Sequence, residues 1–145
     1  MPELPEVTTT VNGINSIAKN LAIKEVWSDW PKLIKFPQFT DFKKDIVGKK
    51  ILGAKRRGKN ILIKLSKGKT LLIHMKMTGH VMYGKWRLAE KGDQPGWNWI
   101  PVTNDEPLND PYNRFIHLIF FLSNGYQLVL ADVRKFAKVM LLEST

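Results

Sequence analysis

The feature that most constrains this chain is a succession of short apolar segments separated by tight turns. Residues 51–57, 60–65 and 70–75 each carry isoleucine or leucine, and the breaks between them are Gly-Lys and Ser-Lys-Gly-Lys. A short break that contains glycine, placed between two such segments, is typical of a β-hairpin. This part of the chain is therefore expected to form consecutive antiparallel strands.

Further strands are expected on both sides of this region. Residues 115–122 and 126–131 flank Ser-Asn-Gly, and Asn-Gly between apolar segments is a strong hairpin signal. Residues 22–28 and 136–142 complete the set. Many short strands joined in sequence indicate an antiparallel sandwich or barrel. We predict a mostly β fold with flanking helices, namely an antiparallel β-sandwich preceded by an amphipathic N-terminal helix.

Residues 1–21 are expected to form that helix after a short lead-in. Apolar residues recur at steps of three and four and so line one helical face: Leu4, Val7, Val11, Ile14, Ala18 and Leu21. Pro5 suits the first turn, because the N–H that proline lacks has no partner there in any helix. Glu3 and Glu6 lie where the helix dipole favours negative charge.

Two stretches follow neither pattern. Residues 29–45 contain two prolines and several lysines, and are expected to hold loops and a short helix. Residues 84–113 are rich in Pro, Gly, Asn, Asp and Trp and are too long for an ordinary connection. We expect residues 84–113 to be an insertion or a mobile loop within a single domain that spans residues 1–145.

The composition limits the possible functions. The chain has 145 residues, of which 43% are hydrophobic, and its formal net charge is +10. Such an excess of positive charge suggests a polyanionic partner, nucleic acid before an anionic membrane, although a merely basic solvated surface is the alternative. The chain contains no cysteine, which excludes disulfides, thiolate nucleophiles and cysteine-ligated zinc.

Other classes are disfavoured by what the sequence lacks. His74, His80 and His117 are scattered and form no pair with metal-ligand spacing, so no metal site is expected. There is no apolar run of 18 residues, and the N-terminus has neither the basic nor the apolar region of a signal peptide. We therefore expect an intracellular, soluble protein that does not associate with membranes.

The opening Met-Pro-Glu-Leu-Pro-Glu-Val is the most informative segment. Removal of Met1 would leave Pro2 with a secondary amine, which can attack an aldehydic carbon and give an iminium ion that acts as an electron sink. An α-amine is roughly a tenth unprotonated at pH 7, against about one in 2,500 for an ordinary lysine. Taken alone, Pro2 is better explained as framing the start of a helix than as a nucleophile.

Four motifs, in order along nearly the whole chain, carry a resemblance to a known family. The start Pro2-Glu3-Leu4-Pro5-Glu6-Val7 is similar to the N-terminal signature of the formamidopyrimidine-DNA glycosylase / endonuclease VIII family. The family also has a turn that carries a functional lysine, a His-x-x-Met-x-Gly segment and an Asp-Pro-Arg-Arg-Phe-Gly loop. The matching segments here are Arg56-Arg57-Gly58-Lys59-Asn60, His74-Met75-Lys76-Met77-Thr78-Gly79 and Asp132-Val133-Arg134-Lys135-Phe136.

The resemblance implies a bifunctional DNA glycosylase / AP lyase that acts on oxidised bases in base-excision repair. It implies that Pro2 attacks C1′ of the damaged nucleoside, that Glu3 is the acid/base partner and that Glu6 supports the terminus. Lys59 and His74 would contact phosphate, with Lys59 also assisting catalysis. The gap left by the flipped base would be filled by Met77, Arg134 and Phe136.

Several features depart from the family pattern. Val133 and Ala137 replace the proline and the glycine of the last motif, so its loop can differ in geometry. The family's helix-two-turn-helix domain is absent from these 145 residues, and a family zinc site would lie in that missing region. The implied partner is double-stranded DNA with a damaged base or abasic site, bound by a monomer. For Trp86, Trp97 and Trp99, packing on the protein is favoured over stacking on DNA.

Three other classes of protein remain as alternatives. The first is a non-catalytic module that binds DNA or recognises damage, which a retained Met1 would favour because the Pro2 nitrogen would then be an amide. A tautomerase with an N-terminal proline would start with a strand after that proline, against the helical periodicity seen here. A generic RNA-binding β-barrel accounts for the charge and leaves the N-terminal motif unexplained.

Overall fold

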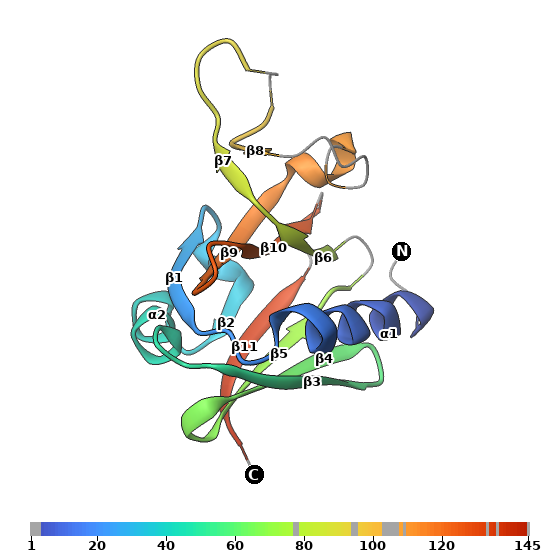
Figure 1. The fold of residues 1–145 in the computed structure, drawn as a ribbon, viewed down its shortest axis with the longest axis vertical. Helices are drawn as coiled ribbons and strands as arrows, with labels where there is room; N and C mark the ends of the chain where they lie inside the picture. Colours follow the sequence, from blue (N-terminus) through green and yellow to red (C-terminus); the bar gives the residue numbers. More distant parts are fainter. Residues whose placement is uncertain are drawn as a thin grey trace.

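The computed structural model describes residues 4–76, 79–93, 96–102, 108, 110–132, 134–135 and 137–144, with the backbone alone for residues 4–6 and 111–112. In this part of the chain the strands form three sheets, shown in Figure 1. The first has the order β1-β9-β10-β6 and the second β2-β11-β5-β4-β3, while β7 and β8 pair separately.

The first sheet consists of β1 (Ile23–Ser28), β9 (Ile116–Leu122), β10 (Gln127–Asp132) and β6 (Gly79–Gly84). The second consists of β2 (Ile34–Phe36), β11 (Lys138–Glu143), β5 (Lys69–His74), β4 (Asn60–Leu65) and β3 (Ile51–Arg57). Neighbouring strands are antiparallel except for β2 and β11, which are parallel. The predicted mostly β fold is thus confirmed, with the one parallel pair made by a short strand that the sequence pattern did not reveal.

The main core lies between these two sheets. Alternate residues of each strand point inward, as the two-residue period of a strand requires. The four-stranded sheet contributes Val26, Leu118, Phe120, Leu122, Leu128 and Leu130, and the five-stranded sheet contributes Ile51, Ile61, Ile63, Leu65, Leu71, Ile73, Val139 and Leu141. Phe42 and Ile46 of the short helix α2 (Phe39–Ile46) are fully buried in the same cluster. One continuous core therefore joins both sheets and α2.

The N-terminal helix packs against one edge of the five-stranded sheet. Helix α1 (Leu4–Gly13) continues as the π-helical turn η1 (Ile14–Ala18) and contacts β3. The side chain of Asn15 accepts a hydrogen bond from the backbone N–H of Ala54 at 2.7 Å and donates one to the carbonyl of Ala54 at 2.8 Å. These two bonds satisfy backbone groups of an edge strand, which would otherwise be open to other chains. The predicted helix is confirmed, although its α-helical part ends at Gly13.

A second, smaller core covers the outer face of the four-stranded sheet. It contains Trp86 of β7 (Trp86–Leu88), Trp99 of β8 (Trp99–Pro101) and Leu108, packed on Ile119 and Val129. Within residues 84–113 the structure thus describes a strand pair, which projects at the top of the view in Figure 1. The indole rings of Trp86, Trp97 and Trp99 are at most 8% exposed, so the expectation that they pack on the protein is confirmed.

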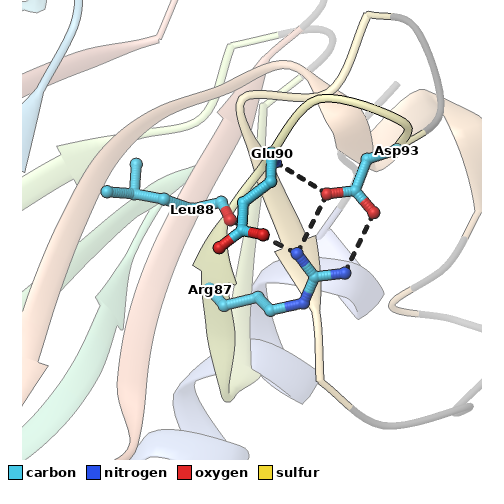
Figure 2. Close-up of polar contacts among 4 residues, drawn as sticks. All are labelled: Arg87, Leu88, Glu90 and Asp93. Carbon is cyan, nitrogen blue, oxygen red and sulfur yellow. Dashed lines mark hydrogen bonds and ion pairs between the residues drawn. The ribbon is translucent and has the colours of Figure 1, made fainter.

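An ion pair ties the segment between β7 and β8. The Arg87 guanidinium donates from both terminal nitrogens to the Asp93 carboxylate, each at 3.0 Å, and the backbone N–H of Glu90 donates to the same carboxylate at 2.7 Å (Figure 2). The Arg87 hydrogen bonds, followed by that from Glu90, lower the pKa of Asp93 to about 2. The carboxylate therefore stays ionised and keeps both partners at any pH near neutrality.

The Asn15 contact gives a test of how α1 and η1 are held. We expect Asn15→Ala to lower the free energy of unfolding by about 1–2 kcal/mol, because two hydrogen bonds to Ala54 are lost. Asn12→Ala, at an exposed position in the same helix, is the control and should not destabilise the chain. Urea denaturation of both variants would measure the difference, and equal stabilities would contradict this role of Asn15.

Candidate nucleic-acid interface

The first element of the site is the hairpin turn between β3 and β4. Gly58 has a φ of 60°, in the left-handed region that a glycine at the first turn position adopts without strain. The Arg56 guanidinium donates to the Gly58 carbonyl at 3.0 Å and so supports the turn from the side. Lys59, at the second turn position, is exposed, as is Arg57. The tip of this hairpin thus presents positively charged side chains to solvent.

The second element is His74, the last residue of β5. Its strand neighbours in register are Asn60 on β4 and Lys138 on β11. The backbone N–H of Lys76 donates to Nδ1 of His74 at 3.0 Å. Because Nδ1 is an acceptor in this bond, the neutral ring carries its proton on Nε2. His74 is thus prepared to donate a hydrogen bond from Nε2 to an acceptor such as a phosphate oxygen.

The pKa of His74 responds to the positive charges of several lysines. Burial lowers the pKa of His74, and the positive charges of Lys76, Lys138 and Lys59 lower it further. The neutral imidazole is therefore favoured near pH 7, and a bound anion would relieve the repulsion among the lysines. Lys59, which the sequence assigned to a phosphate contact, lies close enough to His74 to act on its titration.

The third element is a pair of connections that cross between the two sheets side by side. One runs from His74 on β5 to Gly79 on β6, and the other runs from Asp132 on β10 to Lys138 on β11. Gly79 is paired with Asp132 in the four-stranded sheet, and His74 is paired with Lys138 in the five-stranded sheet. The start of each connection therefore lies next to the end of the other, at the end of the sandwich that also holds Asn60.

The second of these connections is held by hydrogen bonds to the side chain of Asp132. This carboxylate is 2% exposed and accepts the backbone N–H of Arg134 at 3.1 Å and that of Ala137 at 2.7 Å. Lys135 has a φ of 59°, and its ammonium lies 4.3 Å from the centroid of the Trp30 ring. Arg134 is exposed, so the guanidinium is presented to solvent from a connection whose two ends are held.

The eight residues predicted from the sequence differ in how much of them the structure describes. The structure brings Lys59 and His74 together and places Arg134 on the neighbouring connection. Glu6 lies in α1, but its side chain is outside what the structure describes. Four of the predicted residues lie outside the described part of the chain: Pro2, Glu3, Met77 and Phe136. Their roles remain predictions.

Some residues of this end of the molecule were not found from the sequence. Lys76 and Lys138 are two of many lysines, and nothing in their local pattern distinguishes them. His117 had a visible signal, because it is a polar residue inside the apolar run 115–122, and it is 6% exposed in the structure. Its partner Asp29 is 88 positions away in sequence, so no local pattern could link the two.

The described residues offer no metal site and no membrane span. They contain no group of three or more His, Asp or Glu side chains placed to share a metal ion. The zinc that the family resemblance implies therefore does not fit the residues present here, in keeping with the absence of cysteine from the sequence. None of the helices in the described part of the chain is long and apolar enough to cross a membrane.

The structure thus places lysines, a histidine and two connections between the sheets at one end of a β-sandwich. The model of the formamidopyrimidine-DNA glycosylase N-terminal domain matches residues 1–139, and the chain belongs to this family. The formamidopyrimidine-DNA glycosylase of Pelotomaculum thermopropionicum is 39% identical over 141 residues, which cover 97% of this chain and 43% of the relative. The resemblance inferred from the four motifs is confirmed.

Other relatives agree with this assignment. The formamidopyrimidine-DNA glycosylase of Bacillus subtilis is 32% identical, with 97% of this chain and 43% of the relative covered. Among solved structures, a complex of Lactococcus lactis Fpg with abasic-site DNA is similar at a TM-score of 0.75 and 25% identity, over 98% of this chain and 44% of that one. A complex of the same enzyme with DNA that contains Fapy-dG gives a TM-score of 0.74. The chain thus spans less than half the length of these relatives.

The crossing from β5 to β6 can be tested through Gly79. A Cβ added there would lie 2.6 Å from the carbonyl oxygen of Met75, whose backbone would have to move. We expect Gly79→Ala to lower the free energy of unfolding by about 1–3 kcal/mol, the usual range for overpacking. Gly13→Ala is the control, because nothing lies within 4 Å of the added Cβ and the backbone there is helical. It should stabilise the chain by about 0.5–1 kcal/mol. Thermal unfolding of both variants would measure these effects, and a stable Gly79→Ala chain would contradict the tight crossing.

Proposed function

We propose that this chain is the nucleophile-bearing domain of a bifunctional DNA glycosylase / AP lyase that removes oxidised bases, with Pro2 as the nucleophile after removal of Met1. The observation that carries the proposal is the placement of the family motifs at one end of the sandwich. The Lys59 turn, His74 and the Arg134 connection come from distant parts of the sequence and meet there. Relatives of this family are named formamidopyrimidine-DNA glycosylases, and two similar structures contain abasic or Fapy-dG DNA.

The chemistry follows from the properties of a secondary amine. The unprotonated nitrogen of Pro2 forms a bond to C1′ of the damaged nucleoside as the bond between C1′ and the base breaks and the base leaves with a proton. The sugar ring then opens: the bond between C1′ and O4′ breaks, O4′ takes a proton, and C1′ and the nitrogen, which has lost its own proton, form an iminium ion. This ion withdraws electrons from C2′, whose proton passes to a base as the bond between C3′ and the 3′ phosphate breaks. Glu3 would act as the acid/base partner near the sugar, and Glu6 would support the terminus.

DNA binding is assigned to the basic end of the sandwich. Lys59, Lys76 and Lys138 surround His74, and the Nε2–H of its neutral ring can donate to a phosphate oxygen. A base must leave the duplex before C1′ can be attacked, which costs a few kcal/mol. The wedge residues Met77 and Phe136 would offset part of the lost stacking, and Arg134 would donate to the unpaired opposite base.

The activity of this chain alone is expected to be weak. When these 145 residues, which span 43% of the relative from Pelotomaculum thermopropionicum, are tested on their own, contacts from the rest of such a protein are not available to the DNA. Its affinity should therefore be largely electrostatic and sensitive to salt. We expect little or no excision of intact lesions, while Pro2 can still form a Schiff base at an abasic site, where an aldehyde is already available.

Borohydride trapping tests the nucleophile. The chain with Met1 confirmed absent is incubated with an oligonucleotide that bears one abasic site, and we expect a covalent adduct after reduction of the iminium ion. Adding one residue before Pro2 converts its amine to an amide and should abolish the adduct. Lys59→Ala should still give the adduct, although in lower yield, because Lys59 contacts phosphate and assists catalysis without being the nucleophile.

Two outcomes would contradict the assignment. An adduct that survives the N-terminal extension, and that maps to a lysine rather than to the new terminal amine, would mean that a lysine is the nucleophile. No adduct, in spite of measurable DNA binding, would favour a non-catalytic damage-recognition module.

The salt dependence of DNA binding tests the interface. We expect Lys59→Gln to weaken binding to intact and abasic duplexes alike and to reduce the slope of log affinity against log salt by about one. Lys44→Gln is the matched control, because Lys44 is exposed on α2, far from the β3–β4 turn (Figure 1). Fluorescence anisotropy at several salt concentrations would measure both slopes. Equal slopes for the two variants would contradict a phosphate contact by Lys59.

A further inference from the structure

The inference concerns His117, a buried polar residue to which the proposed function gives no role. The pairing of β9 with β10 shifts its register between Leu118, opposite Leu130, and Ile116, opposite Ala131. His117 is therefore an extra residue in a β-bulge. As a consequence, Leu118 points into the main core while Ile116, only two residues away, points into the smaller core. Bulges of this kind redirect a side chain and are frequent next to functional sites.

Both ring nitrogens of His117 contact an oxygen that can only accept. Nδ1 lies 2.7 Å from Oδ1 of Asp29, and Nε2 lies 3.1 Å from the backbone carbonyl of Asp132. Because a neutral imidazole has a single N–H, both bonds form together when the ring is an imidazolium. The contact between Asp29 and the His117 ring joins the residue that follows β1 to the second residue of β9.

The His117 ring also contacts the connection that carries Arg134. The carbonyl of Asp132 receives the His117 ring, while its carboxylate holds the N–H groups of Arg134 and Ala137. Next to Asp29, the ring of Trp30 lies under the ammonium of Lys135. The end of β1 is further fixed by Ser28, whose hydroxyl donates to the carbonyl of His117 at 2.5 Å. The 132–138 connection is thus tied to β1 at two points, at Asp132 and at Lys135.

We propose that His117, oriented by Asp29, is a positioning residue for this connection and sets the preference of the interface for damaged over intact DNA. The proposal rests on the proposed function, in which Arg134 enters the gap beside the flipped base. Lysines that bind phosphate attract both kinds of DNA equally. Discrimination requires Arg134 to be held in place before binding, because a connection that must first be ordered loses affinity to that ordering. His117 acts through Asp132 and need not contact DNA.

Two variants separate this role from simple stability. His117→Phe keeps a ring of similar size in the bulge and removes both hydrogen bonds, and the Asp29 side chain, 32% exposed, can then be solvated. Such exchanges of a buried ion-pair member for an apolar residue are often tolerated when the partner is not left buried. Asp29→Ala is the second variant, and its position at the surface makes folding secure. Val129→Ala, a buried apolar truncation on the adjacent strand β10, is the control for stability alone.

The first measurement is amide hydrogen exchange by NMR without DNA. We expect the N–H groups of Arg134 and Ala137 to exchange about tenfold faster in His117→Phe, and faster in Asp29→Ala, than in the parent chain. Val129→Ala should change these two amides no more than the others of β10. Unchanged exchange of both amides in both variants would overturn the tie.

The second measurement is the ratio of the dissociation constants for intact and abasic duplexes. We expect His117→Phe to reduce this ratio about fivefold or more while leaving the salt slope unchanged, and Val129→Ala to keep the parent ratio. If the exchange rates rise and the ratio does not fall, the positioning role is wrong, although the proposed function stands. If the parent chain itself shows neither a preference for abasic DNA nor a trapped adduct, the proposed function is the part that fails.

Discussion

The packing of two sheets around one apolar core is the constraint on which the rest of this structure depends. Each sheet buries the alternate residues of its strands against the other, so the chain can pass between the sheets only at their ends. The crossings from His74 to Gly79 and from Asp132 to Lys138 lie at the same end, because the strands that they leave and enter are paired in register. Segments from distant parts of the sequence thus meet as a result of ordinary sheet pairing. The core fixes where a site can form, and the residues at the crossings decide what it does.

Several positive charges lie near His74 at this end of the molecule. The positive charges of Lys76, Lys138 and Lys59 disfavour the imidazolium form of His74 and lower its pKa further than burial alone does. Among the described residues, the carboxylate of Asp132 accepts two backbone N–H groups and that of Asp29 contacts His117. A bound anion would offset the positive charge of the lysines. This is the arrangement expected of a surface that binds phosphate.

The sequence predicted the elements whose signals are local. The hairpin turn at Gly58 and Lys59 was found because its flanking strands and its glycine are adjacent in sequence, and the strand pair around Asn124-Gly125 was found in the same way. The strands β2 and β6 were not predicted, since three residues are too few for a pattern in β2 and β6 mixes glycine, histidine and tyrosine. The site shows the same division. Motifs led to the prediction of Lys59, His74 and Arg134 as site residues, and that prediction stands untested. The contact of His117 with Asp29 depends on a bulge and on pairing over 88 positions, which no local pattern encodes.

In the proposed function, affinity and discrimination for DNA have separate physical sources. The net charge of +10 can bring any duplex to the surface, and it does so without reading a base. Discrimination needs a small number of groups held in place where a base is missing, and exposed arginine side chains are held poorly unless their backbone is fixed. Here the backbone N–H of Arg134 is held by the buried carboxylate of Asp132. The backbone carbonyl of Asp132 is in turn contacted by the ring of His117 in the bulge. The buried polar groups that add least to the core are therefore the ones that can make a basic surface selective.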